Sequence, residues 1–171
     1  DVSNGRLYVA DTNNNRVLIY TSAITMNGQD ADLVLGQSNM TSSSARTARN
    51  GLAAPEGIAV NSNTNRLAVA DRDNNRVLIW DEAPLTNGQN AAVVVGQSTF
   101  TSASFGASEK ALHGPRGVAI DSNNGYLYVA DTENNRALIW TGALSSNNPA
   151  ADYVIGQPNF DSSAVQTTSA S

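Results

Sequence analysis

The chain has 171 residues, a formal net charge of −5 and no cysteine. An acidic chain gains nothing from counterion release on a polyanion, so nucleic-acid binding is disfavoured, and no apolar run reaches the roughly 20 residues that span a bilayer. The absence of cysteine excludes disulfides, thiolate nucleophiles and cysteine metal sites.

One segment occurs three times, at residues 10–20, 70–80 and 130–140. Each copy begins with Ala-Asp, passes through Asn-Asn-Arg and ends in an apolar run. The three copies are spaced 60 residues apart, and a Gly-Gln pair further along keeps the same register in each copy. A fixed period without slippage is typical of a repeat architecture.

The second repeat is complete and contains four short apolar runs, at residues 57–60, 66–70, 76–80 and 92–95. They are rich in β-branched residues and are bounded by Gly, Asn, Asp or Pro, which predicts strands, and none has a helical spacing. Because the runs are apolar on both faces, each four-stranded sheet must be covered on both sides. Sheets stacked around an axis satisfy this requirement, so the sequence predicts an all-β fold, a β-propeller segment.

Residue sizes favour the same architecture. Gly57 and Ala59 lie in the first strand of the second repeat, whereas the bulky Trp80 ends the third strand. Blades converge toward the axis of a propeller, so the innermost strands have the least space between sheets. We therefore expect the first strand of each repeat at the hub.

We expect one propeller domain of three blades, each of about 60 residues. Propellers typically have four to eight blades, so three blades predict part of a larger ring, and we expect six. The remaining blades would come from the same longer chain or from another copy. We expect residues 1–60 to hold a first blade without its innermost strand, an inter-blade loop and strand one of the second blade. Residues 61–120 hold the rest of the second blade, a loop and strand one of the third blade. Residues 121–157 complete the third blade, and residues 158–171 form a tail leading to a missing blade.

The inter-blade loops are long, but they carry apolar residues in register. Leu52 and Leu112 occupy equivalent positions, as do Met40, Phe100 and Phe160. Loops of this length are often functional. We expect the apolar residues to pin them to the body of the blades.

Three motifs of the third repeat together resemble NHL repeats: Pro-Arg-Gly-Val-Ala-Ile-Asp at 115–121, Gly-Tyr-Leu-Tyr-Val-Ala-Asp-Thr at 125–132 and Asn-Asn-Arg at 134–136. The resemblance covers nearly the whole chain, although the 60-residue period exceeds the common repeat. It implies a propeller, often six-bladed, that binds protein, RNA or small ligands. Related six-bladed propellers include lyases and lactonases with a metal or a catalytic histidine at the axis.

An Asp and an Arg flank each turn between the second and third strands. Arg presents a planar fork that suits a partly buried carboxylate, and a threefold repetition of turn chemistry needs only folding to explain it. The acidic turn at 71–75 lacks the Gly and Glu of a calcium loop, so we predict no metal. The predicted structural pairs are Asp11 with Arg16, Asp71 with Arg76, and Asp131 with Arg136.

One position breaks the repeat where each inter-blade loop enters strand one. It is Glu56 in the second blade and Arg116 in the third, each between Pro and Gly. Propeller geometry places this position near the axial mouth, so both residues are candidate ligand contacts, the alternative being ordinary surface. Arg72 also varies but is interpreted as solvated surface, and His113, the only histidine, as an exposed loop residue that cannot form a multi-histidine metal site.

The leading hypothesis is a non-enzymatic binding or structural module that contacts a protein or carbohydrate partner at the axial mouth and the long loops. The alternative is a fragment of a six-bladed lyase or lactonase whose catalytic residues lie in other blades. We predict no catalytic residue, metal or cofactor in this chain, no nucleic-acid partner and no membrane insertion. A single Lys against nine Arg, with many Asn, Ser and Thr residues, favours an extracellular or cell-surface location.

Overall fold

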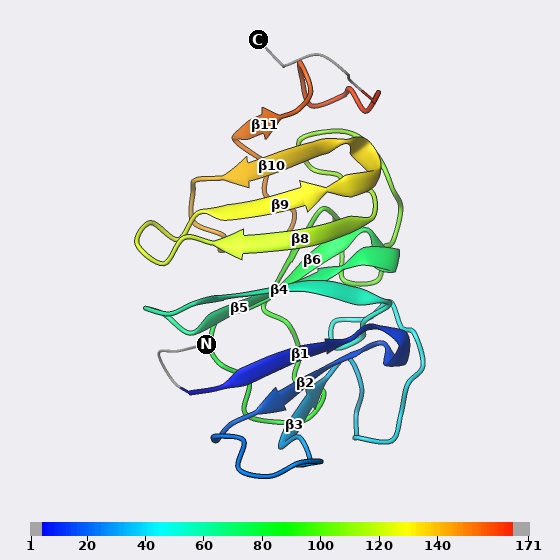
Figure 1. Ribbon diagram of the computed structural model, residues 1–171. Coiled ribbons are helices and arrows are strands. Elements are labelled where there is room, and N and C mark those ends of the chain that lie inside the picture. Colours follow the sequence, from blue (N-terminus) through cyan, green and yellow to red (C-terminus); the bar gives the residue numbers. More distant parts are fainter. Residues whose placement is uncertain (1–4, 166–171) are drawn as a thin grey trace.

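The protein forms three antiparallel β-sheets, one for each repeat, in a computed structural model that describes residues 5–165 (Figure 1). In every sheet the strands follow chain order from one edge to the other. The first blade comprises β1 (Leu7–Asp11), β2 (Arg16–Tyr20) and β3 (Leu33–Leu35); the second comprises β4 (Pro55–Asn61), β5 (Arg66–Asp71), β6 (Arg76–Trp80) and β7 (Val93–Val95); the third comprises β8 (Pro115–Ile120), β9 (Leu127–Asp131), β10 (Arg136–Trp140) and β11 (Tyr153–Ile155).

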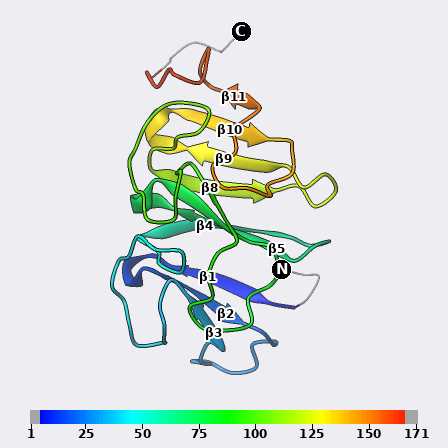
Figure 2. The same cartoon turned by 180° about the vertical axis from the view of Figure 1, so that it is seen from behind.

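The three sheets are stacked one upon the next as propeller blades, an order that is also visible from behind (Figures 1 and 2). The second blade lies in the middle, and its first strand, β4, contacts both β1 and β8. The predicted all-β propeller segment is therefore confirmed. Three blades do not close a ring, which typically needs four to eight, so further blades complete the propeller.

The apolar core lies between the blades in two layers. One face of the second blade, including Leu67 and Trp80, packs against Val17 and Ile19 of the first blade. Its opposite face, including Ile79, packs against the third blade. Burying both faces of β6 explains why the four residues after Arg76 are all apolar and do not alternate with polar residues.

In each blade the connection that leads into the strand beginning with Arg forms one short 3-10 helix. These helices are η1 (Thr12–Asn14), η2 (Arg72–Asn74) and η3 (Thr132–Asn134). The sequence predicted the turns but not this helical geometry. An Asn with a left-handed backbone ends each of them, as at Asn75, where φ is 52°. Within residues 5–165 no helix is long and apolar enough to cross a membrane.

The inter-blade loops are pinned by the leucines that the sequence singled out. Leu52 and Leu112 are fully buried. A Cβ placed on Gly96 would lie 2.6 Å from Leu112 Cδ1, so the Gly-Gln motif leaves space for the leucine of the following loop. Phe100 and Phe160 pack against the same two layers. The loops therefore have fixed positions over the ends of the blades.

The inner strands of the second and third blades, β4 and β8, pack closely at Gly57, on the side of the sheets nearest the propeller axis. A Cβ on this residue would lie 2.5 Å from the carbonyl oxygen of Arg116 and 2.9 Å from the amide nitrogen of Val118. Both atoms belong to the backbone of the neighbouring blade and cannot rotate away. The expectation that small residues line the hub is confirmed here, because only glycine lets two inner strands approach so closely.

Replacing Gly57 with Ala should therefore push the second and third blades apart. Forced overpacking costs about 1–3 kcal/mol, and we expect a loss in the free energy of unfolding within that range. Gly117→Ala is the matched control, because its nearest neighbour would be the Ala130 methyl carbon at 3.3 Å. Urea denaturation at neutral pH measures both changes; an equal loss in the two variants would contradict close packing at Gly57.

Candidate functional site

A buried ion pair fixes the turn of the second blade. Arg76 Nε lies 2.7 Å from Asp71 Oδ2, and both side chains are fully buried. Asp71 also accepts hydrogen bonds from Asn74 Nδ2 (2.8 Å) and from the Ala53 amide nitrogen (2.6 Å). The carboxylate thus holds its own turn and the inter-blade loop together.

The guanidinium group of Arg76 extends this connection. Its Nη2 donates to the carbonyl oxygens of Ala48 (2.9 Å) and Gly51 (3.0 Å) in the preceding loop. Its Nη1 donates to the carbonyl oxygen of Phe100 in the following loop. One arginine therefore joins the loops on both sides of its blade, a role that the five-donor fork of Arg permits and that a Lys ammonium does not.

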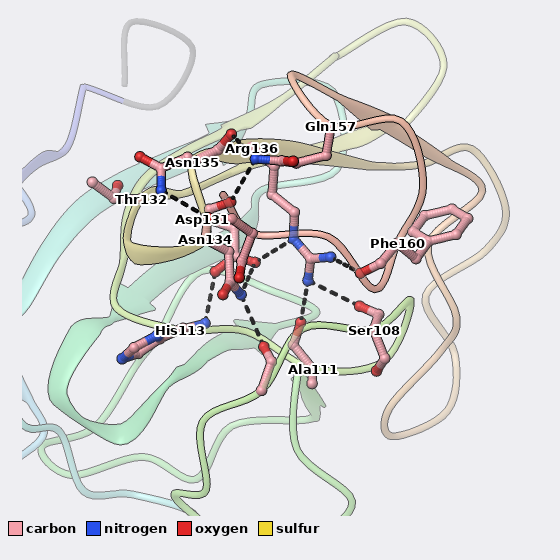
Figure 3. A network of polar contacts seen from close by, with 12 residues as sticks. Ser108, Ala111, His113, Asp131, Thr132, Asn134, Asn135, Arg136, Gln157 and Phe160 are labelled. Carbon is pink, nitrogen blue, oxygen red and sulfur yellow. Dashed lines mark hydrogen bonds and ion pairs between the residues drawn. The ribbon is translucent and has the colours of Figure 1, made fainter. Parts of the chain in front are cut away.

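The third blade repeats this arrangement (Figure 3). Arg136 Nε lies 2.7 Å from Asp131 Oδ2, and both side chains are again fully buried. Asp131 Oδ1 accepts a hydrogen bond of 2.7 Å from the amide of His113, which lies in the loop below it in Figure 3. Arg136 Nη2 donates to Ser108 and Ala111. Asp11 and Arg16 are paired at 2.6 Å in the first blade, with the side chains 23% and 17% exposed.

Burial has an electrostatic consequence for Asp71. Desolvation raises the pKa of this carboxyl group to about 6, although the charge of Arg76 and the hydrogen bonds from Ala53, Asn74 and Arg76 act in the opposite direction. The carboxylate is still ionised at neutral pH. Asp71 and Arg76 neutralise each other in the buried turn, so the loss of either side chain would leave the other charge buried without its counterion.

The side-chain amides of Asn75 and Gln97 hold loop residues 99–114 in place. Asn75 Nδ2 donates to Ala103 (3.0 Å), and its Oδ1 accepts from the Gly114 amide (2.8 Å). Gln97 Nε2 donates to the carbonyl oxygens of Asn75 (2.9 Å) and Ser104 (2.6 Å). These residues recur in every repeat, so each blade presents its loop in the same place.

The candidate contacts Glu56 and Arg116 meet at the same end of the arc. Arg116 Nη1 lies 3.1 Å from Glu56 Oε1, across the boundary between the second and third blades. Arg72 Nη1 lies 2.5 Å from the same oxygen, with its side chain 28% exposed, and this contact was not predicted from the sequence. Arg116 Nη2 also approaches Glu133, at 3.5 Å, and both of these side chains are about half exposed.

An aromatic pair lies beside these charges. The rings of Phe105 and His113 are stacked with their centroids 4.6 Å apart, and the Phe105 residue is 70% exposed. His113 was expected to be an exposed loop residue, but the stacking leaves it half-buried. The preceding loop has Ala45 and Ala53 at the equivalent positions, so this pair is specific to one loop.

A hollow of about 420 Å³ lies between the second and third blades, and its lining includes Arg72, His113, Arg116 and Glu133. Glu56 and Phe105 contact these lining residues. Residues from two blades and one loop converge on it, which sequence spacing alone could not show. The varying identities of Phe105 and His113 between repeats were the signal that could have found them. We call this surface the rim; it consists of Glu56, Arg72, Phe105, His113, Arg116 and Glu133.

The buried pair of the second blade should be essential for folding. Asp71→Asn leaves the Arg76 charge without a counterion, and breaking a buried pair costs about 3–5 kcal/mol. The equivalent Asp11→Asn affects a partly solvated pair and should cost less. Urea denaturation near pH 7.5, where Asp71 is ionised, measures both losses; a larger loss for Asp11→Asn would refute the importance of burial.

Comparison with known protein families gives a match to the NHL repeat at three segments, residues 1–20, 52–80 and 112–136. A comparison with curated proteins gave no match. Within residues 5–165 no group of three or more His, Asp or Glu side chains is arranged to hold a metal ion. The three matched segments contain the inner strands, the 3-10 turns and the Asp–Arg pairs described above, and the chain therefore carries three NHL-type repeats.

Proposed function

We propose that this chain is a non-enzymatic binding module whose ligand contacts the rim between the second and third blades. The observation that supports this proposal is where the repeat varies. The residues of the buried turns recur every 60 positions, whereas the rim residues do not. Arg72 replaces the Thr of the other two turns, and Phe105 and His113 replace alanines. Folding explains the recurring residues but gives no reason for the rim residues.

The chemistry of the rim suits a partner with both apolar and polar groups. The exposed Phe105 ring offers an aromatic face, and aromatic faces pack well against proline rings, aliphatic side chains and the apolar faces of sugars. The half-exposed Arg116 and Glu133 side chains next to it can form hydrogen bonds with backbone amides or hydroxyl groups. This combination supports a protein or carbohydrate partner.

The charged groups of the rim act as a positioning network in this proposal. Glu56 Oε1 accepts from Arg72 at 2.5 Å and from Arg116 at 3.1 Å, so the carboxylate holds two arginines side by side. The longer contact of Arg116 with Glu133, at 3.5 Å, can yield to a ligand at little cost. We place the module outside the cell or at its surface on the basis of its composition.

The proposal is tested with a glycan array and a displayed peptide library, both probed with the 171-residue chain. A ligand selected in this way should bind at least tenfold more weakly to the variant Phe105→Ala/His113→Ala/Arg116→Ala. Two of these changes restore the residues of the equivalent loop, so the urea midpoint should change little. Leu85→Ala, at the opposite end of the second blade, is the control and should bind normally.

Three outcomes would oppose the proposal. Binding that survives the triple substitution but is lost in the Leu85 variant would place the ligand at the other end of the arc. Chemical turnover of a bound glycan, followed by chromatography, would instead support the lyase or lactonase alternative. The absence of any ligand in both libraries would also count against a rim site for sugars or peptides.

A further inference from the structure

The outer edge of the first blade is covered by a loop of the second blade. The connection between β6 and β7, residues 81–92, extends from its own blade to β3 of the first blade (Figures 1 and 2). The Val34 amide donates to Asn87 Oδ1 at 3.0 Å, and the Gly88 amide donates to the Val34 carbonyl oxygen at 2.8 Å. One Asn-Gly dipeptide therefore occupies both backbone groups of a residue in the edge strand.

The third blade covers the outer edge of the second blade in the same way. The Val94 amide of β7 donates to Asn147 Oδ1 at 3.2 Å, and the Asn148 amide donates to the Val94 carbonyl oxygen at 2.8 Å. Asn147 follows Asn87 by 60 residues, which is the period of the repeat. The contact therefore recurs at both blade boundaries, as the buried Asp–Arg pairs do in the second and third blades.

A tryptophan attaches each of these connections to its own blade. Trp80 Nε1 donates to the Gln89 carbonyl oxygen, and Trp140 Nε1 donates to the Pro149 carbonyl oxygen, both at 3.0 Å. Both indole rings are buried in the layers between the blades. Each connection is therefore held at its base by the core, while its asparagine lies on the edge of the preceding blade.

The covered valine is the residue through which β3 could pair with another strand. Leu33 and Leu35 flank Val34 in the antiparallel pairing of β3 with β2. Backbone groups of successive residues point alternately toward and away from a neighbouring strand. Val34 points away from β2, because its amide and carbonyl groups are bonded to the loop, so Leu33 and Leu35 point toward β2. The same alternation leaves Val94 as the outward residue of β7.

We propose that Asn87 and Asn147 cap the outer edges of the first and second blades and thereby prevent another copy of this chain from pairing with them. An uncovered edge strand is a template for pairing with a second chain. Each edge has one outward residue, so a single acceptor and a single donor close it. The side-chain carbonyl of Asn supplies the acceptor in place of a neighbouring strand. We call these contacts the edge caps; they consist of Asn87 and Gly88 on Val34, and of Asn147 and Asn148 on Val94.

The experiment replaces Asn87 with Ala in the 171-residue chain. Asn87 is exposed, so the core of the blades is unaffected, but the Val34 amide loses its acceptor and the edge opens. We expect the dissociation constant for self-association, measured by sedimentation velocity, to be at least tenfold lower than that of the unmodified chain. Association through other surfaces is common to both proteins, so the ratio of the two constants reports on the edge.

Asn63→Ala is the matched control. Asn63 Nδ2 also donates across a blade boundary, to the Ser122 carbonyl oxygen at 2.7 Å, but it lies in the turn between β4 and β5, away from the outer strands. This variant should self-associate with a dissociation constant within twofold of that of the unmodified chain. An equal increase in association for Asn63→Ala and Asn87→Ala would show that a weakened blade boundary is the cause, and would overturn the proposal.

Asn147→Ala opens the edge of β7 and gives a second reading if Asn87→Ala lowers the urea midpoint. In this variant the Val94 amide loses its acceptor, so the second blade has the uncovered edge. We again expect the dissociation constant to fall at least tenfold. If neither asparagine variant associates more tightly than the unmodified chain, the edge caps do not prevent pairing and the proposal is wrong.

Hydrogen exchange of the Val34 amide locates the new contact. In dilute Asn87→Ala this amide should exchange at least tenfold faster than in the unmodified chain. Its protection should return as the protein concentration rises, because the strand of a second copy then accepts its hydrogen bond. Association without renewed protection of Val34 would place the contact elsewhere and contradict the proposal. Neither measurement involves a rim residue, so the result is independent of the proposed function.

Discussion

The buried Asp–Arg pair is the interaction on which the rest of this structure depends. In the second and third blades it joins the 3-10 turn, the preceding inter-blade loop and the following loop through one carboxylate and one guanidinium group. Removing two charges from water is costly, and the cost is offset only when every donor and acceptor has a partner. Asp71 and Arg76 meet this condition because backbone amides and carbonyl groups from two loops converge on them. Each blade is therefore fixed to its neighbours by polar contacts at one end and by apolar layers along its faces.

This construction separates the parts of the chain that must recur from the parts that are free to vary. The turns, the glutamine amides and the leucines of the loops serve the same purpose in each blade, so their residues repeat. Rim residues such as Phe105, on a rigidly held loop, and Arg116, in β8, are not repeated in the preceding blade. A rigid scaffold with variable side chains at one end is the usual arrangement of a binding surface.

Much of this fold could be predicted because the same strand and turn signals occur at equivalent positions of the three repeats. The four apolar runs, the turn asparagines and the small residues near Gly57 all agreed with one architecture. The pairing of Asp71 with Arg76 was also accessible, since only a structural role explains a pair that recurs every 60 residues. By contrast, the contact of Arg72 with Glu56 was missed, because these residues come from different segments and neither is repeated. The stacking of Phe105 on His113 was missed for the same reason.

The sequence alone determined the period, the strands and the buried pairs, because each follows from residues that are close along the chain or that recur at a fixed interval. Only the tertiary structure decided which side chains meet at the rim. That feature depends on how the second and third blades are stacked. The stacking is set by the close approach at Gly57 and by the core layers between blades, and these are contacts between residues far apart in sequence.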